Sequence, residues 1–362
     1  MVNCRAMKSE NNIFENLLKK TGIDIGLFIR KALSLKKVVI ICGPTCAGKS
    51  KVASRLARIL HTDIISVDSM QVYRGMDIGT DKYDTSSAGI KQYMIDVFDP
   101  DRQVTAVLFR DMCREIIEKE FFLKGKIPLM AGGSGLYIRS VNDELEFLSF
   151  SGSKKIGNSA INEKPSGSIR AEILKEVKNG AAGRLYEELQ AIDPVYAAKI
   201  SKNDSRRIIR AMEVFKTTGQ PFSNFQKSWN KRKSRYNSTF IGLEREKNSL
   251  GECISERVES MFKKGFISEV KKLAELGYGN STSMLQAVGY RQVKNFLDGN
   301  ITIDECKNDI TSATKKLVKK QMTWFKADPR VNWINADNYE TITDLLIEVI
   351  SIIWKDLSYE KD

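Results

Sequence analysis

The sequence has a single histidine, His61, and none of its six cysteines forms a Cys-x-x-Cys pair. Zinc sites in proteins are built mostly from closely spaced cysteines and histidines, so this scarcity argues against a zinc site. It also excludes any Ser-His-Asp arrangement that does not use His61, which we interpret as a loop or strand-edge residue. Six cysteines without disulfide-like spacing fit a reducing compartment, and we expect a cytoplasmic protein.

Long hydrophobic runs are also missing. No apolar run approaches the roughly 18 residues that a membrane-spanning helix requires, so we expect no membrane association. The N-terminal residues lack a signal-peptide core, and they contain Glu10, Glu15 and Asp24, which transit peptides avoid. We therefore predict that residues 1–36 form a peripheral helical extension.

Positive charge is present in excess. Among the 362 residues, 58 are Lys or Arg and 45 are Asp or Glu, which gives a net charge of +13. Such a charge favours a polyanionic partner, and nucleic acid before a membrane surface. A chain of this length buries a full hydrophobic core and has room for two domains or for a core with an insertion.

The stretch GPTCAGKS lies between the apolar run VVIIC and the helical pattern of KVASRLARIL. Its glycines let the backbone wrap closely, so that successive N–H groups point at a phosphate at the start of a helix. Lys49 adds a positive charge, and the Ser50 hydroxyl is a ligand for Mg²⁺. The pattern predicts a P-loop for a phosphate or a diphosphate and leaves open which molecule carries it. The predicted phosphate-binding residues are Gly43, Pro44, Thr45, Cys46, Ala47, Gly48, Lys49 and Ser50.

Short apolar strands alternate with helical patterns after the P-loop. DIISV is followed by Asp68, and IPLMA leads into the loop GGSG. This alternation predicts an α/β fold, with a P-loop core whose parallel sheet is flanked by helices and whose ligands lie at the carboxyl ends of the strands. From about Arg257 the pattern is helical almost to the end of the chain. We expect a first part of the core at 37–145, a helical insertion domain at 146–235 with a flexible linker at 149–168, and a second part of the core with C-terminal helices at 236–362.

Polar residues follow two of these strands. Asp68 stands where a carboxylate can act as a general base, although a turn carboxylate is the simpler interpretation. Gln71 and Arg74 supply donors and acceptors suited to a nucleobase, and Lys82 adds charge that we expect near phosphates. Ser134, in the GGSG loop, is expected to point into the same site.

Two further stretches are basic. Arg206, Arg207 and Arg210 lie three and four residues apart, and therefore share a face of a predicted helix. Lys315, Lys316, Lys319 and Lys320 form a stripe along a later helix, with Gln321 and Trp324 close behind. Guanidinium groups and exposed aromatics beside lysines suit RNA with unstacked bases. Taken alone, the arginine run is more typical of a solvated face, and Trp324 alone is more typical of a core.

Together and in this order, these stretches resemble the tRNA dimethylallyltransferase family. The matching pieces run from about Val38 to Lys326 and are GPTCAGKS, DSMQVYRGMDIGTDK, GGSGLYI, SRRIIRAMEV, ERVESMFKKGFISEV, QAVGYRQ and KKQMTWFK. The resemblance implies transfer of a dimethylallyl group from dimethylallyl diphosphate to N6 of adenine 37 in tRNAs. It also implies dependence on Mg²⁺ and an insertion domain that clamps the tRNA anticodon stem-loop. We expect a monomer.

The resemblance also implies roles for individual residues. Lys49 and the rest of the P-loop hold the departing diphosphate, Ser50 ligates the metal, and Asp68 accepts the proton of the adenine amine. Ser134 matches a family threonine near the reacting centre. The implied tRNA-binding residues are Asp68, Ser69, Met70, Gln71, Arg170, Arg206, Arg207, Ile208, Ile209, Arg210, Gln286, Ala287, Val288, Gly289, Tyr290, Arg291, Lys319, Lys320, Gln321 and Trp324.

Three alternatives are a prenyltransferase acting on free adenine nucleotides, a small P-loop kinase, and an RNA-binding protein that uses the loop only structurally. The net charge and the stretches QAVGYRQ and KKQMTWFK argue against the first, and the lack of a lid arginine pattern argues against the second. The combination of Asp68, Lys49 and Ser50 argues against the third. The chain departs from the family at Tyr83, Gln92 and Tyr93, where a proline and a histidine pair are usual, which leaves the local structure there in question.

Overall fold

The computed structural model describes residues 21–85, 88–145, 166–179, 182–226 and 232–359. The chain divides into two compact units, one of Met1–Asn142 with Arg235–Asp362 and one of Asp143–Ser234. The first unit contains the sheet, and the described helices of the second pack around a core of their own. Residues 1–20 of the predicted extension and 149–165 of the predicted linker lie outside the described residues.

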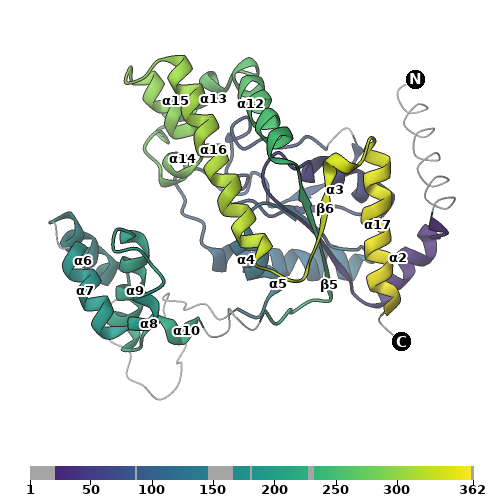
Figure 1. The fold of residues 1–362 in the computed structure, drawn as a ribbon, viewed down its shortest axis with the longest axis horizontal. Coiled ribbons are helices and arrows are strands. Elements are labelled where there is room, and N and C mark those ends of the chain that lie inside the picture. The colour runs from purple at the N-terminus through teal and green to yellow at the C-terminus, as the bar shows by residue number, and fades with distance from the viewer. Residues whose placement is uncertain (1–20, 86–87, 146–165, 180–181, 227–231, 360–362) are drawn as a thin grey trace. The chain divides into compact units, whose positions relative to one another are not determined.

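The described residues of the first unit form a sheet of six parallel strands (Figure 1). In space the strands follow the order β3-β2-β4-β1-β5-β6. This arrangement confirms the predicted α/β fold with a parallel sheet flanked by helices. The strands are β1 (Val38–Cys42), β2 (Ile64–Ser66), β3 (Gln92–Tyr93), β4 (Leu129–Gly132), β5 (Ser238–Glu244) and β6 (Val331–Asn335).

Helices cover both faces of the sheet, which explains why β1 reads as an unbroken apolar run. Val38 and Ile40 of β1 belong to one core cluster, whereas Val39 and Ile41 belong to the other. The first cluster includes α4 (Ala106–Ile116) and α5 (Gly135–Asn142), and the second includes α3 (Lys49–Ile59) and α17 (Ile342–Tyr359) (Figure 1).

A second group of helices follows β5 and packs on itself, in the order α12, α13, α14, α15 and α16 along the chain. Strand β6 then separates α16 from α17, so the prediction of a nearly all-helical end was wrong at this point. The bounds of these helices are α12 (Lys247–Lys263), α13 (Phe266–Glu275), α14 (Thr282–Gln286), α15 (Tyr290–Leu297) and α16 (Ile303–Lys326).

The described end of the N-terminal extension is part of the core. Helix α2 (Ile25–Ser34) begins at Asp24, whose carboxylate accepts a hydrogen bond from the Leu27 amide at 2.7 Å. Phe28 of α2 is fully buried, and its ring stacks on that of Trp354 with 6.2 Å between centroids. Helix α2 therefore fills this part of the core beside α17, and the prediction that this segment is peripheral was wrong.

The second unit is built from five described helices around a small apolar core. Helix α9 begins after Asp204, whose carboxylate accepts a hydrogen bond from the Arg207 amide at 3.2 Å. Ile208 and Ile209 on α9 are buried, so their side chains cannot contact RNA, and this part of the predicted binding set is corrected. The helices are α6 (Ser166–Lys178), α7 (Ala182–Ile192), α8 (Pro194–Ala197), α9 (Ser205–Thr218) and α10 (Phe222–Phe225).

Candidate functional site

The phosphate loop depends on glycine at both ends. Gly43 has a φ of 135°, and a Cβ atom there would lie 2.2 Å from the carbonyl oxygen of Leu243 in β5. Any other residue would therefore push β1 and β5 apart where the loop begins. Gly48 has a φ of 87° at the N-cap of α3, again a conformation that favours glycine. The predicted turn from strand to helix is thus built as a P-loop requires.

Lys49 lies at the start of α3 and points back along the loop. Its Nζ donates a hydrogen bond to the Pro44 carbonyl at 2.6 Å. Burial lowers the pKa of Lys49 to about 8, and the nearby Asp68 carboxylate opposes that shift. The ammonium and the carboxylate therefore act on one another across the site.

A cavity of about 560 Å³ joins the loop to the other predicted site residues. Its lining comes from the P-loop, from the stretch 68–82 and from helices α12 and α16. Because parallel strands end at one edge of the sheet, residues that follow β1, β2 and β4 converge here. The lining includes Lys49, Ser50, Asp68, Gln71, Arg257 and Gln321.

Asp68 is held in a turn just after β2. Its Oδ1 accepts a hydrogen bond from the Met70 amide at 2.8 Å. Among the described residues, none donates a hydrogen bond to Oδ2. The Ser134 hydroxyl accepts a hydrogen bond from the Ser69 amide at 3.1 Å, and Ser134 does not line the cavity. Ser134 therefore positions the segment that carries Asp68, whereas we expected it to point into the site.

Gln71 also faces the cavity, and its amide is already engaged. It accepts a hydrogen bond from the Ser66 hydroxyl at 2.7 Å and donates one to the Thr80 carbonyl at 3.1 Å. The amide thereby ties β2 to the end of the 68–82 stretch. Met70 lies between this cavity and a second one of about 170 Å³, since it lines both.

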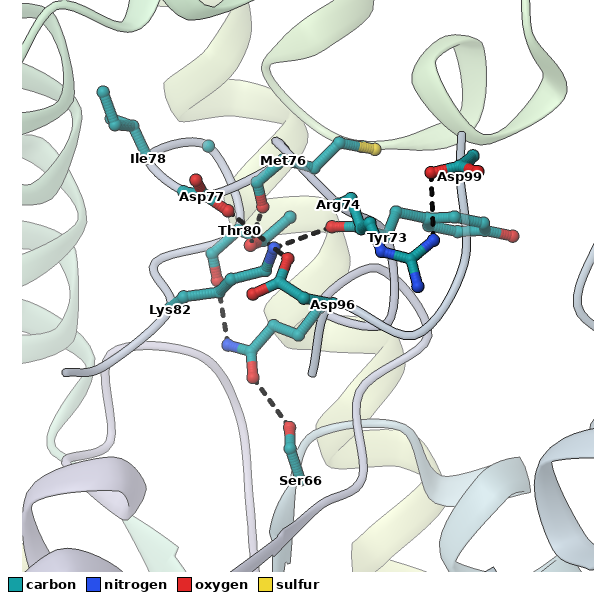
Figure 2. Close-up of polar contacts among 12 residues, drawn as sticks. Ser66, Tyr73, Arg74, Met76, Asp77, Ile78, Thr80, Lys82, Asp96 and Asp99 are labelled. Carbon is teal, nitrogen blue, oxygen red and sulfur yellow. Dashed lines mark hydrogen bonds and ion pairs between the residues drawn. The ribbon is translucent and has the colours of Figure 1, made fainter. Parts of the chain in front are cut away.

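Lys82 has a structural role that the sequence did not reveal. Its Nζ donates to the Tyr73 carbonyl at 2.7 Å and pairs with Asp77 and Asp96 at 2.6 Å each (Figure 2). Two carboxylates neutralise the charge that we expected near phosphates. Arg74 pairs with Asp99 at 3.0 Å and does not line the cavity, so the expectation that it meets a nucleobase is also corrected.

Glu269 of α13 holds the same stretch from the other side. Its carboxylate accepts hydrogen bonds from the backbone amides of residues 77, 78 and 79 at 3.1, 2.7 and 3.3 Å. The Tyr290 hydroxyl donates to it at 2.7 Å. Tyr290 is completely buried, so its predicted contact with RNA is corrected to a positioning role.

The other residues from Gln286 to Arg291 differ in their exposure to solvent. Ala287 and Gly289 are buried, and Ala287 lines the cavity. Val288 is half-buried and lines the cavity. Gln286 and Arg291 are exposed, as an RNA-contacting residue must be.

Arg257 is a site residue that was not predicted. From α12, its guanidinium donates to the Thr45 hydroxyl at 2.8 Å and to the Asp81 carboxylate at 3.0 Å. It adds positive charge to the phosphate loop from a helix more than 200 residues away in the sequence. The available signal was its place in ERVESMFKKGFISEV, one of the stretches that carry the family resemblance.

Helix α16 lines the cavity with Ile310, Thr314, Leu317 and Gln321, and it also carries a basic surface. Gln321 accepts a hydrogen bond from the Thr45 amide at 2.9 Å and donates one to the Gly133 carbonyl at 3.1 Å. Trp324 is 40% exposed and packs over Gly135, so its interpretation as a core residue was wrong. The predicted lysine stripe is exposed along its length, and no ion pair joins it to a described carboxylate. Its members are Lys315, Lys316, Lys319 and Lys320.

The arginines of the second unit differ in their surroundings. Arg170 and Arg210 both pair with the buried Glu213 at 3.0 Å. Arg206 and Arg207 are exposed, and Arg207 also pairs with Asp204 at 3.3 Å. Carboxylates of α9 and of its N-cap therefore pair with part of the positive charge on this helix.

At Tyr83, Gln92 and Tyr93, where the chain departs from the family pattern, the residues form defined hydrogen bonds. The Gln92 amide donates to the Tyr83 carbonyl at 2.5 Å and to the Thr85 hydroxyl at 2.9 Å. The Tyr93 hydroxyl donates to Glu120 at 2.8 Å, and burial together with this carboxylate raises the pKa of Tyr93. Both residues form β3 at the edge of the sheet.

A metal ion at this site would need ligands beyond the protein. Within the described residues there is no group of three or more His, Cys, Asp or Glu side chains placed to hold an ion. Magnesium commonly keeps several waters and uses one or two protein groups with substrate phosphates. Ser50, which is exposed and lines the cavity next to Lys49, fits such a partial set.

None of the described helices has the length and apolar character to cross a membrane.

Comparison with known families gives two matches. The family described as IPP transferase matches residues 71–328, and the one described as isopentenyl transferase matches residues 36–91. Together these ranges include the phosphate loop, Asp68, Arg257 and Gln321.

Individual relatives resemble the chain over most of its length. A tRNA dimethylallyltransferase of Carboxydothermus hydrogenoformans is 39% identical over 315 residues, which are 86% of this chain and 96% of the relative. One of Geobacter sulfurreducens is 37% identical over 317 residues, which are 86% and 97%. The crystal structure of a tRNA isopentenylpyrophosphate transferase of Bacillus halodurans has a TM-score of 0.64 and 33% identity, and the match covers 89% of this chain and 97% of that one.

Proposed function

The chain belongs to the IPP transferase family, and from that premise we propose that it transfers a dimethylallyl group from dimethylallyl diphosphate to N6 of adenine 37 in tRNAs. The observation that carries the proposal is that Lys49 and Asp68 line one cavity and interact there. A phosphate-binding cation and a carboxylate with an unengaged oxygen are the two groups that this transfer requires.

The donor diphosphate lies in the P-loop. Backbone N–H groups at the start of α3 face it, and Lys49 and Arg257 place two positive charges beside the loop. As the allylic carbon–oxygen bond breaks, the electron pair leaves with the diphosphate. Cations fixed before the reaction stabilise that departing charge without reorganising.

The acceptor is the exocyclic amine of an extruded adenine. A base inside a stack cannot reach the cavity, so it must leave the stack to meet Met70 and Gln71, which line the cavity. N6 attacks the allylic carbon, and the new carbon–nitrogen bond replaces the broken carbon–oxygen bond. Asp68 accepts the proton that N6 loses, through the oxygen that no described residue occupies.

Ser50 is the residue that would hold Mg²⁺, together with donor oxygens and water. When bound, the ion supplies further positive charge to the diphosphate. Three other residues of the chain hold the phosphate loop and the catalytic turn in position. Gln321 and Arg257 fix the loop through Thr45, and Ser134 fixes the turn that carries Asp68.

Recognition of the anticodon stem-loop is assigned to basic side chains on both units. The exposed lysines of α16 and the exposed Arg206 and Arg207 of α9 bind phosphates, and Trp324 offers a ring for stacking. These contacts distinguish a tRNA substrate from a free nucleotide, which has too few phosphates to need them.

A competition experiment tests the proposal. Purified protein is mixed with Mg²⁺, labelled dimethylallyl diphosphate, unmodified tRNA and adenosine monophosphate, and label is followed into each acceptor. We expect label in tRNA alone, located at N6 of adenine 37 after digestion to nucleosides. Label in the mononucleotide instead would identify a prenyltransferase of free nucleotides and reject the proposal. A tRNA in which adenine 37 is replaced by guanine serves as the control.

A further inference from the structure

Two cysteines that are distant in the sequence meet at the phosphate loop. Cys46 is in the loop itself, and Cys253 is on α12. The Cys253 thiol donates to the Cys46 carbonyl, with 3.6 Å between sulfur and oxygen. The Cys253 sulfur is therefore in contact with the residue that carries the other thiol, and no step of the transfer reaction uses either thiol.

Both thiols are open to small molecules. Cys46 and Cys253 are half-exposed and line the 560 Å³ cavity. The other described cysteines, Cys42, Cys113 and Cys306, are buried and do not line that cavity. A reagent that enters the site thus reaches this pair before any other described thiol.

We propose that Cys46 and Cys253 form an oxidation site, at which a hydroperoxide converts the two thiols into a disulfide that ties α12 to the phosphate loop. The Cys46 sulfur attacks the peroxide, the oxygen–oxygen bond breaks, and a sulfenic acid and water form. The Cys253 sulfur then attacks the Cys46 sulfur, and a second water leaves. The two thiols lose two hydrogens and two electrons, which the peroxide accepts.

The surroundings order these two steps. Burial, with a contribution from Cys46, raises the pKa of Cys253 to about 11, so this thiol stays protonated. Because the Cys253 thiol stays protonated, we assign the first attack on the peroxide to Cys46 and the resolving step to Cys253.

The disulfide would change the shape of the donor site. A sulfur–sulfur bond is about 2.05 Å long and holds the two Cα atoms about 5.5 to 6 Å apart, so it would fix the distance between the loop and the helix. Cys253 and Arg257 are four residues apart on α12 and share a face. The link would therefore also constrain Arg257, which bonds to Thr45 of the loop. The consequence for donor binding rests on the proposed function, whereas formation of the disulfide does not.

Peptide mapping under non-reducing conditions tests the chemistry. The full-length protein is treated with hydrogen peroxide, remaining thiols are alkylated, and the linked peptides are identified by mass spectrometry. We expect one reversible link, between Cys46 and Cys253, which dithiothreitol removes. Cys253→Ser should abolish the link, whereas Cys306→Ser, the matched control, should leave it unchanged. A stable oxidised Cys46 without a link, or a link between other cysteines, would overturn the proposal.

Donor binding tests the consequence. Binding of dimethylallyl diphosphate to the oxidised protein should be roughly tenfold to 100-fold weaker, because small displacements at a site are that costly. Dithiothreitol should restore it, and Cys253→Ser should bind the donor equally well before and after peroxide. Unchanged binding by the linked protein would reject a regulatory effect. Failure of the reduced protein to transfer the prenyl group would count against the proposed function alone, since the mapping result stands without it.

Discussion

The side chain of Gln321 accepts a hydrogen bond from the Thr45 amide at 2.9 Å, although 276 residues separate the two in the sequence. Its amide nitrogen reaches the Gly133 carbonyl, so one side chain joins the phosphate loop to the loop after β4. Gly133 has to be glycine for this contact, because a Cβ there would lie 2.4 Å from the Gln321 amide nitrogen. Helix α16 therefore helps to shape the donor site, beyond the contact with tRNA that the sequence predicted for Gln321.

Replacing Gln321 should weaken catalysis through the donor. In Gln321→Ala both hydrogen bonds are lost, and one or two such bonds are worth about 1 to 2 kcal/mol, or about a tenfold lower kcat/KM for dimethylallyl diphosphate. The measurement is steady-state kinetics with the donor varied, and tRNA affinity measured separately. Thr323→Ala, on the same helix but with its hydroxyl bonded only to the Lys319 carbonyl, should leave both unchanged. A lower tRNA affinity with normal donor kinetics would show that Gln321 serves the RNA.

Donor binding should depend on pH through Lys49. The pKa of Lys49 in the free protein is lowered to about 8, and the anionic donor binds to the protonated form. Affinity should therefore be constant below about pH 7 and fall as the pH rises through about 8, until the pKa in the bound state is reached. Isothermal titration from about pH 7 to about pH 9.5 measures this decline. Lys49→Met should bind weakly at every pH, and an undiminished affinity at high pH would contradict the assignment.

Tyr290→Phe separates a positioning role from an RNA contact. The substitution removes the hydroxyl that donates to Glu269 and leaves the packing of the ring in place. We expect a loss of about 1 kcal/mol in the free energy of unfolding, measured by denaturant titration. The affinity for tRNA and its salt dependence should stay unchanged, since the side chain is buried. A drop in tRNA affinity without a loss of stability would restore the prediction made from the sequence.

The lysine stripe of α16 should set the salt dependence of tRNA binding. Changing Lys315, Lys316, Lys319 and Lys320 to Gln removes phosphate contacts, and each lost contact lowers the slope of log K against log salt by roughly 0.7 to 0.9. Filter binding or fluorescence titration at several salt concentrations measures the slope. Lys119 and Lys124, which already pair with Glu115 and Glu120, provide a control of the same chemistry. Equal effects from the control lysines would show a general charge effect without a defined surface.

The sequence predicted the parts of the fold whose signals are local. VVIIC, the glycine loop and the following helix were placed correctly, because an apolar run, glycines and helical spacing are all visible in neighbouring residues. Strand β6 was missed, since Asn332 and Asn335 make it polar and only two of its five residues are buried. Its place is decided by pairing with β5, which is contact with a distant part of the chain.

The site residues likewise fall into those that local sequence signals predict and those that depend on packing between distant parts of the chain. Asp68 and Lys49 follow strands at the predicted edge, so the topology alone brings them together. Arg257 and the bridging role of Gln321 depend on where α12 and α16 pack, and no spacing within either helix encodes that. A tryptophan is usually expected in a core, but Trp324 lies over Gly135 at the surface. Its position depends on how the helices pack against one another.

A single-turnover comparison of the wild-type protein with Asp68→Asn tests the central claim, that Asp68 takes the proton from the adenine amine. The substitution keeps the shape and the acceptor for the Met70 amide while removing the base. With tRNA and donor bound, we predict a rate of transfer lower by roughly 100-fold to 10,000-fold, the range of general base catalysis, and tRNA affinity within a factor of about two. A variant that binds tRNA normally and transfers the prenyl group at the wild-type rate would contradict the account.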